Sequence, residues 1–163
     1  TGMRCRAVAA YPMYRGVSRL LGMEATEVVD DPAAEFTAVK TAWPEADFFF
    51  VHIKKTDAYG EDGDFDAKRK LIEAVDTHIP TLRALHPDVF LVTGDHSTPA
   101  TLKAHSWHPV PTLLHAPRAQ RPDGVTTFGE KACLAGSLGP RFPAPELMPL
   151  ALGYAGRLRK FGA

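Results

Sequence analysis

The residues best suited to chemistry are an adjacent aspartate and histidine, Asp95 and His96, with a second histidine, His105, nine residues after His96. They follow an apolar run over residues 89–92, which predicts a buried parallel strand. Open α/β sheets place their chemistry at the carboxyl ends of such strands. Carboxylate oxygen and imidazole nitrogen together suit borderline divalent metals. The pattern therefore predicts a metal site, and phosphate chemistry is the first hypothesis to test.

A second acidic cluster follows another apolar run. Residues 47–53 predict a strand, and Asp57 and Glu61 come just after it, close to Lys54. If the two strand ends meet on one face of a parallel sheet, Asp57 and His105 could share one ion while Asp95 and His96 hold another. Two metal ions about 3.5–4 Å apart are a common apparatus for phosphoryl transfer. Lys54 could contact a substrate phosphate, or it could simply balance the nearby carboxylates.

The elements that must position these residues alternate along the chain. Strands are predicted at residues 6–10, 26–29, 47–53, 88–93 and 112–115, and helices at 12–21, 31–43, 66–85, 98–104 and 145–159. Asp57 is expected in a loop between two of them. Strand alternating with helix predicts an α/β fold, with a mostly parallel sheet and helices on both faces.

The helix over residues 66–85 has the clearest pattern. Asp64 or Asp66 could cap it, and Pro80 predicts a kink. In a different helix, the one predicted over residues 12–21, Arg15 and Arg19 are expected on a face exposed to solvent. Apolar residues of the long helix recur at alternating spacings of four and three, which predicts one stripe facing a sheet: Leu71, Val75, His78, Leu82 and Leu85.

Composition narrows the class of protein. The 163 residues are a usual length for one domain, and 45% hydrophobic with 23% charged residues predicts a packed core under a polar surface. The formal net charge is zero, so nothing points to nucleic acid or an anionic membrane as a partner. No apolar run approaches the roughly 20 residues of a spanning helix. Cys5 and Cys133 are too few for a disulfide framework and lack metal-ligand spacing, which predicts buried, reduced thiols in a cytoplasmic protein.

Several segments also match a known family pattern that runs almost from end to end of the chain. The matching segments are residues 51–54, 56–65, 93–99 and 105–111, with weaker flanking matches at 14–23 and 128–133. Asp95-His96 and the downstream His105 are the most specific part of the match. On these residues, the chain resembles the C-terminal half of the cofactor-independent phosphoglycerate mutases of the archaeal type, members of the alkaline-phosphatase superfamily.

The resemblance implies an alkaline-phosphatase-like fold and an isomerase of glycolysis that interconverts 3-phosphoglycerate and 2-phosphoglycerate through a phosphoserine. It implies two divalent ions, Mn²⁺ first, with Zn²⁺, Co²⁺ or Mg²⁺ as alternatives, and no 2,3-bisphosphoglycerate. The metal ligands would be Asp57, Asp95, His96 and His105, with Lys54 as a weaker candidate for substrate binding. Many relatives have a ligand histidine where Glu61 stands, so Glu61 would have to substitute as an oxygen ligand.

Family members are more than twice as long as this chain. Residues 1–163 are therefore expected to be the C-terminal portion of the metal-binding domain, and the sheet is expected to be incomplete without an N-terminal part. That part would supply the nucleophilic serine and the substrate domain. This chain alone is expected to be inactive, with an exposed sheet edge that favours self-association.

Other interpretations stay open at this point. Asp95 could cap the helix expected near Thr98, and His96 could be a hydrogen-bonded structural residue. His108 stands three residues after His105 and is expected at the surface, without a metal-binding role. The parent protein could instead be another phosphomutase or a phosphatase of the same superfamily. It could also be a non-catalytic module that uses the fold for assembly.

Overall fold

The computed structural model describes residues 2–118 and 121–158. They form two compact units. Unit 1 contains the chain up to His86 together with Thr98–Ala104, and unit 2 contains Pro87–Ser97 together with the chain from His105 onward. The chain therefore passes from one unit to the other within the motif that carries the predicted metal ligands.

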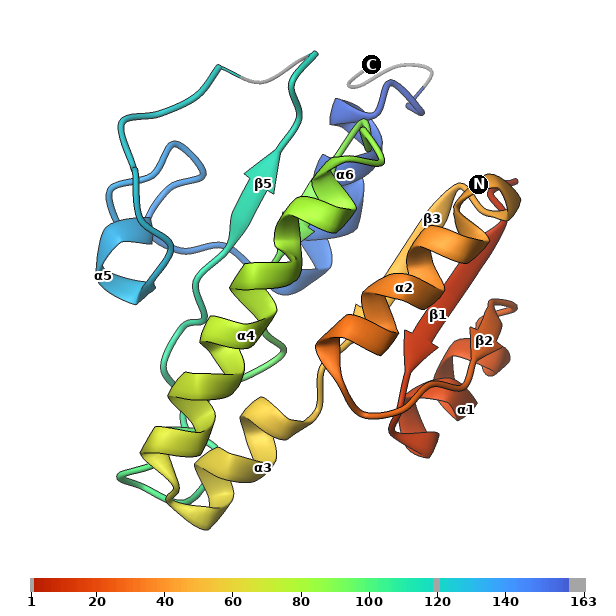
Figure 1. Cartoon of the computed structure of the whole chain (residues 1–163). Helices are drawn as coiled ribbons and strands as arrows, with labels where there is room; N and C mark the ends of the chain where they lie inside the picture. The colour runs from red at the N-terminus through yellow and green to blue at the C-terminus, as the bar shows by residue number, and fades with distance from the viewer. Residues whose placement is uncertain (1, 119–120, 159–163) are drawn as a thin grey trace. The chain divides into compact units, whose positions relative to one another are not determined.

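Unit 1 is built on a three-stranded parallel sheet in the order β2-β1-β3 (Figure 1). Helix α1 joins β1 to β2, and helix α2 with the short 3-10 turn η1 joins β2 to β3. The first crossover leads from β1 outward to β2, and the second leads back from β2 past β1 to β3, in the opposite direction. Such crossovers are almost always right-handed, so α1 and α2 lie on opposite faces of the sheet. The predicted α/β class, with a parallel sheet flanked by helices, is confirmed. The bounds are β1 Cys5–Ala9, α1 Pro12–Leu20, β2 Glu24–Thr26, α2 Pro32–Ala42, η1 Trp43–Glu45 and β3 Phe48–His52.

The core of unit 1 lies around its central strand. Ala7, Val8 and Ala9 of β1 have no exposed surface, and Phe36 and Val39 of α2 are buried. Small side chains on β1 suit a strand that is covered by a helix on each face, because bulky residues would hold the helices away from the sheet. This packing fixes the carboxyl ends of β1 and β3, where the first candidate residues follow.

Helix α4 (Phe65–Arg83) begins where the sequence predicts. The side chain of Asp64 accepts a hydrogen bond from the backbone N–H of Ala67 at 2.9 Å, which confirms Asp64 as the cap. Pro80 lies inside the helix. The apolar stripe meets helices, because α4 packs against α2 and α3 (Lys55–Asp62). The ring of His78 meets Phe36 edge-on, with the centroids 6.5 Å apart.

Three local predictions for unit 1 are wrong. Asp57 lies in the first turn of helix α3 and not in a loop; Gly60 lowers the helix propensity of this segment, and packing against α4 compensates. Residues 98–104 form turns and not a helix, since Lys103 has a φ of +51° that a right-handed helix does not allow. Arg15 is buried, with 8% of its surface exposed. Its guanidinium donates to the carbonyl oxygens of Ala9 and Ala10 at the end of β1.

Unit 2 has a different arrangement. Strand β4 (Phe90–Val92) pairs antiparallel with β5 (Leu113–His115), so the parallel, fully buried strand predicted at residues 89–92 is wrong. The partner strand follows β4 along the chain and returns beside it, which an apolar run alone does not reveal. The remaining elements are α5 Glu130–Cys133, η2 Ala144–Glu146 and α6 Leu147–Tyr154. The helix predicted over residues 145–159 is thus shorter, and Arg159 lies outside the described residues.

The lengths of the helices bear on whether the chain could cross a membrane. Within residues 2–118 and 121–158, none is both long enough and apolar enough to span a bilayer. Cys5 in unit 1 and Cys133 in unit 2 are both free thiols and half-buried.

Candidate metal centre

In unit 1, the candidate residues follow the carboxyl end of β3, the strand beside central β1. The chain runs outward from β1 to β2 and then returns past β1 to β3, so the strand order reverses at β1. Open α/β sheets bind ligands at the carboxyl ends of the strands beside such a reversal. Lys54 precedes α3, and its ammonium lies 5.6 Å from the centre of the ring of Tyr11, which follows β1. Asp57 lies in the first turn of α3, where the helix dipole stabilises a carboxylate.

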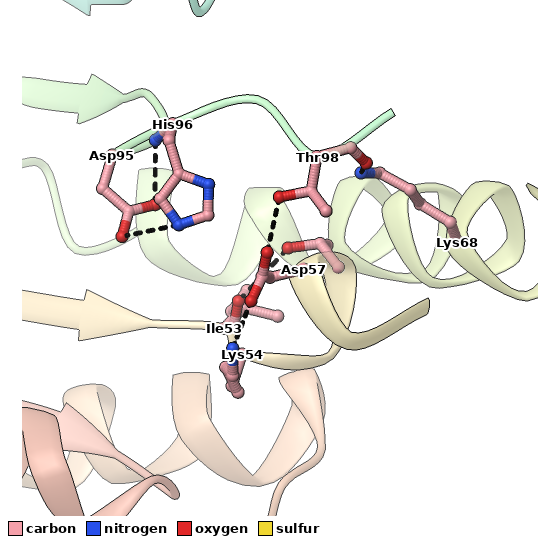
Figure 2. Close-up of polar contacts among 8 residues, drawn as sticks. Ile53, Lys54, Asp57, Lys68, Asp95, His96 and Thr98 are labelled. Carbon is pink, nitrogen blue, oxygen red and sulfur yellow. Dashed lines mark hydrogen bonds and ion pairs between the residues drawn. The ribbon is translucent and has the colours of Figure 1, made fainter. Parts of the chain in front are cut away.

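The carboxylate of Asp57 is held on both oxygens (Figure 2). The ammonium of Lys54 donates to Oδ2, and the hydroxyl of Thr98 donates to Oδ1. The side chain of Asp57 is 15% exposed and that of Lys54 is 27% exposed, so water screens the ion pair only partly. The hydrogen bond to Asp57 raises the pKa of Lys54 against the opposing effect of burial. Lys54 is therefore a cation beside this carboxylate.

Thr98 belongs to the same cluster, although its place in the sequence is distant. Its backbone oxygen accepts a hydrogen bond from Lys68 of α4 at 2.5 Å (Figure 2). Glu61 lies one turn beyond Asp57 on α3 and is exposed, and its charge helps to raise the pKa of Lys54. No sequence signal pointed to Lys68, because its contact joins residues 30 positions apart. Thr98 lies within the matching segment of residues 93–99, but its hydrogen bond to Asp57 could not be predicted from the sequence.

In unit 2, the structure brings together the Asp-His pair and the downstream histidine. The rings of His96 and His105 lie with centroids 3.8 Å apart. A β-bridge between Ser97 and Ser106, with a backbone hydrogen bond of 2.9 Å, holds the two histidine-bearing segments side by side. The sequence predicted that His96 and His105 belong to one two-metal centre, each on a different ion, and the bridge supplies a local reason for their approach.

Asp95 lies beside His96. Its Oδ1 accepts the backbone N–H of His96 at 3.1 Å, and its Oδ2 lies 3.6 Å from Nε2 of the His96 ring (Figure 2). Asp95 and His105 are exposed, and His96 is half-buried. The two neighbouring imidazoles of His96 and His105 are nitrogen donors that suit a borderline divalent cation such as Mn²⁺ or Zn²⁺, and the carboxylate of Asp95 lies beside the first of them. His108 lies apart in its contacts, since its Nδ1 is 2.8 Å from the hydroxyl of Ser106 and its ring stacks on Trp107.

Comparison with known proteins agrees with this donor chemistry. A family model described as the metalloenzyme superfamily matches residues 2–151. The chain belongs to the metalloenzyme superfamily. Membership of this superfamily implies that the protein depends on metal, in agreement with the approach of His96 and His105.

Relatives of this superfamily member carry a more specific name. The chain is 55% identical over 158 residues to a probable 2,3-bisphosphoglycerate-independent phosphoglycerate mutase of Thermosipho africanus. That match covers 96% of this chain and 39% of the relative. The chain thus spans about two fifths of the length of the curated relatives it matches. The resemblance to cofactor-independent phosphoglycerate mutases is confirmed, as is the greater length of its members.

Solved structures show the same relationship. The PH0037 protein from Pyrococcus horikoshii matches with a TM-score of 0.91 and 30% identity, over 99% of this chain and 44% of that one. A cofactor-independent phosphoglycerate mutase from Thermoplasma acidophilum matches with a TM-score of 0.74 and 25% identity, over 94% of this chain and 37% of that one. The fold of this metalloenzyme superfamily member is therefore that of phosphoglycerate mutase-like proteins.

Proposed function

We propose that this chain supplies metal ligands to a phosphoglycerate mutase that interconverts 3-phosphoglycerate and 2-phosphoglycerate in glycolysis, in the cytoplasm. The observation that carries the proposal is the 55% identity, over 96% of the chain, to a relative with that name. The substrate would be a small phosphorylated acid. No 2,3-bisphosphoglycerate would be needed, as the name of that relative states for the relative itself.

The proposed ligands of the metal centre are Asp57, Asp95, His96 and His105, and two divalent ions would bind there. Asp57 and His96 are half-buried and His105 is exposed, and each can present one ligand atom. Thr98 supports the inclusion of Asp57 with the histidines, because it bonds to Asp57 and follows His96 by only two residues. Consecutive Cα atoms are 3.8 Å apart, so the Cα atoms of His96 and Thr98 are at most about 7 Å apart.

Each proposed residue has a defined chemical task. The ions would stabilise negative charge on the phosphoryl oxygens and lower the pKa of a serine nucleophile. The carboxylates of Asp57 and Asp95 and the neutral imidazoles of His96 and His105 would hold the ions. We propose that the serine that becomes phosphorylated lies outside these 163 residues, so that this chain alone would be inactive. Lys54 would be released from Asp57 when an ion binds, and it could then meet a substrate phosphate.

The proposal extends to Glu61, to the identity of the metal and to self-association. Glu61 is exposed on α3, one turn beyond Asp57, and we propose it as an additional oxygen ligand. Mn²⁺ is the proposed metal because mixed oxygen and nitrogen ligands favour Mn²⁺, Zn²⁺ or Co²⁺ over Mg²⁺. In unit 1, β2 and β3 form the edges of the three-stranded sheet, and self-association through such an edge also stays a prediction.

A ³¹P NMR assay of the full-length protein tests the function directly. With Mn²⁺, the signal of 3-phosphoglycerate should be replaced in part by that of 2-phosphoglycerate, and a chelator should stop the exchange. The variants Asp57→Ala and His96→Ala should stop it as well. Release of inorganic phosphate would instead identify a phosphatase. Neither reaction, with no metal bound, would favour a non-catalytic assembly module.

A further inference from the structure

The two hydrogen bonds on Asp57 differ in what they allow a metal ion to do. Lys54 places a positive charge on Oδ2, which a bound cation must displace or repel. The hydroxyl of Thr98 is neutral and uses one of the two lone-pair directions of Oδ1. A cation can therefore bind Asp57 while the bond from Thr98 persists. The bond from Thr98 is thus the one that can orient Asp57 both before and after an ion binds.

Thr98 is itself held in place by two other elements. It is 3% exposed, and Lys68 of α4 binds its backbone oxygen. On the α3 side, Gly60 leaves room for that same oxygen, because a Cβ at Gly60 would lie 2.2 Å from it. Because α3 and α4 hold the backbone of Thr98 and the residue is buried, its side chain has few alternative rotamers in which the hydroxyl could bond to another group.

We propose that Thr98 is a positioning residue for the metal ligand Asp57. The inference rests on the proposed function, in which Asp57 binds a divalent ion. Residues that orient metal ligands through hydrogen bonds typically change metal affinity by 10–100-fold when they are removed. A purely structural hydroxyl would affect the stability of the fold but leave the metal affinity unchanged.

The test compares two substitutions in the full-length protein by calorimetric titration with Mn²⁺. Thr98→Val keeps the shape of the side chain and removes the donor, and it should weaken Mn²⁺ binding by about 10–100-fold. Thr98→Ser keeps the donor, and its affinity should stay within about threefold of the wild type, which is under 1 kcal/mol. Thr101→Val is the matched control, since Thr101 is an exposed threonine of the same segment, and it should leave the affinity unchanged.

Lys68→Met tests the positioning of Thr98 without changing Thr98 itself. It removes the donor to the Thr98 backbone oxygen and leaves every proposed ligand in place. It should weaken Mn²⁺ binding less than Thr98→Val does. Circular dichroism of each variant checks that the fold persists. Equal affinities for Thr98→Val and Thr98→Ser would overturn the positioning role while the metal centre stands. A wild-type protein that binds no Mn²⁺ would overturn the proposed function, and this inference with it.

Discussion

Glu35 is a buried carboxyl group without a hydrogen-bond partner among the described residues, and it predicts a specific dependence of stability on pH. It lies in the first turn of α2 with no exposed surface, and neither carboxylate oxygen has a hydrogen-bond partner in the described part of the chain. Burial raises its pKa from 4.5 to about 8, and the charges of Asp30 and Asp31 add to this effect, while Lys55 opposes it. Glu35 is therefore protonated in the folded protein at neutral pH.

The sign of the effect follows from proton linkage. Between pH 4.5 and about 8, the folded protein keeps a proton on Glu35 that the unfolded chain releases. The free energy of unfolding should therefore be highest below pH 4.5, fall as the pH rises, and become level above about 8. At 1.36 kcal/mol for each tenfold change in proton affinity, the whole fall is on the order of 5 kcal/mol, and about 2–3 kcal/mol of it lies between pH 5.5 and 7.5.

Substitution Glu35→Gln isolates this effect, because the amide has the same shape and does not ionise. Urea unfolding at several pH values should show that the variant gains stability over the wild type as the pH rises, by about 1 kcal/mol or more for each pH unit. Fluorescence of Trp43 reports on unit 1, since Trp43 follows α2 and its ring stacks on Phe49 at 5.4 Å. Trp107 is 83% exposed and should change little on unfolding.

The control is Glu73→Gln, which removes an exposed carboxylate that pairs with Arg69 on α4. This variant should keep the pH slope of the wild type, because the exposed surface pair that it removes contributes little to stability. If the stability curves of wild type and Glu35→Gln run parallel between pH 5.5 and 7.5, Glu35 does not hold a proton in the folded state, and the reasoning is refuted.

Four further substitutions test the site and the packing of unit 1. Gly60→Ala should weaken Mn²⁺ binding, because the new Cβ must push Thr98 away from Asp57; unchanged Mn²⁺ affinity in calorimetry would contradict this. In the full-length protein, His96→Ala should nearly abolish phosphoglycerate turnover while His108→Ala stays mild, and the reverse order would shift the ligand assignment by three residues. Arg15→Met should lower the free energy of unfolding in urea by about 1–3 kcal/mol, since it removes the donor to the carbonyl oxygens of Ala9 and Ala10 at the end of β1; a loss below about 0.5 kcal/mol would argue against that role.

The sequence by itself determined the class of fold and the identity of the candidate ligands. Alternation of apolar runs with helical periodicity depends only on neighbouring residues, so β1, α2, β3 and α4 could be predicted close to their observed bounds. The types and spacing of Asp95, His96 and His105 could be read in the same way. Their chemistry is a property of the side chains, and their approach needs only the short bridge between Ser97 and Ser106.

Only the tertiary structure decided what surrounds Asp57 and Glu35. Thr98 is 41 residues from Asp57, and their hydrogen bond exists because α3 and α4 pack together and Gly60 permits close approach. A glutamate near a helix N-terminus is expected to be exposed to solvent. Glu35 is buried instead, because α2 is covered by both the sheet and α4. Burial and long-range hydrogen bonds arise from packing between elements, and local patterns of residues carry no record of which elements will meet.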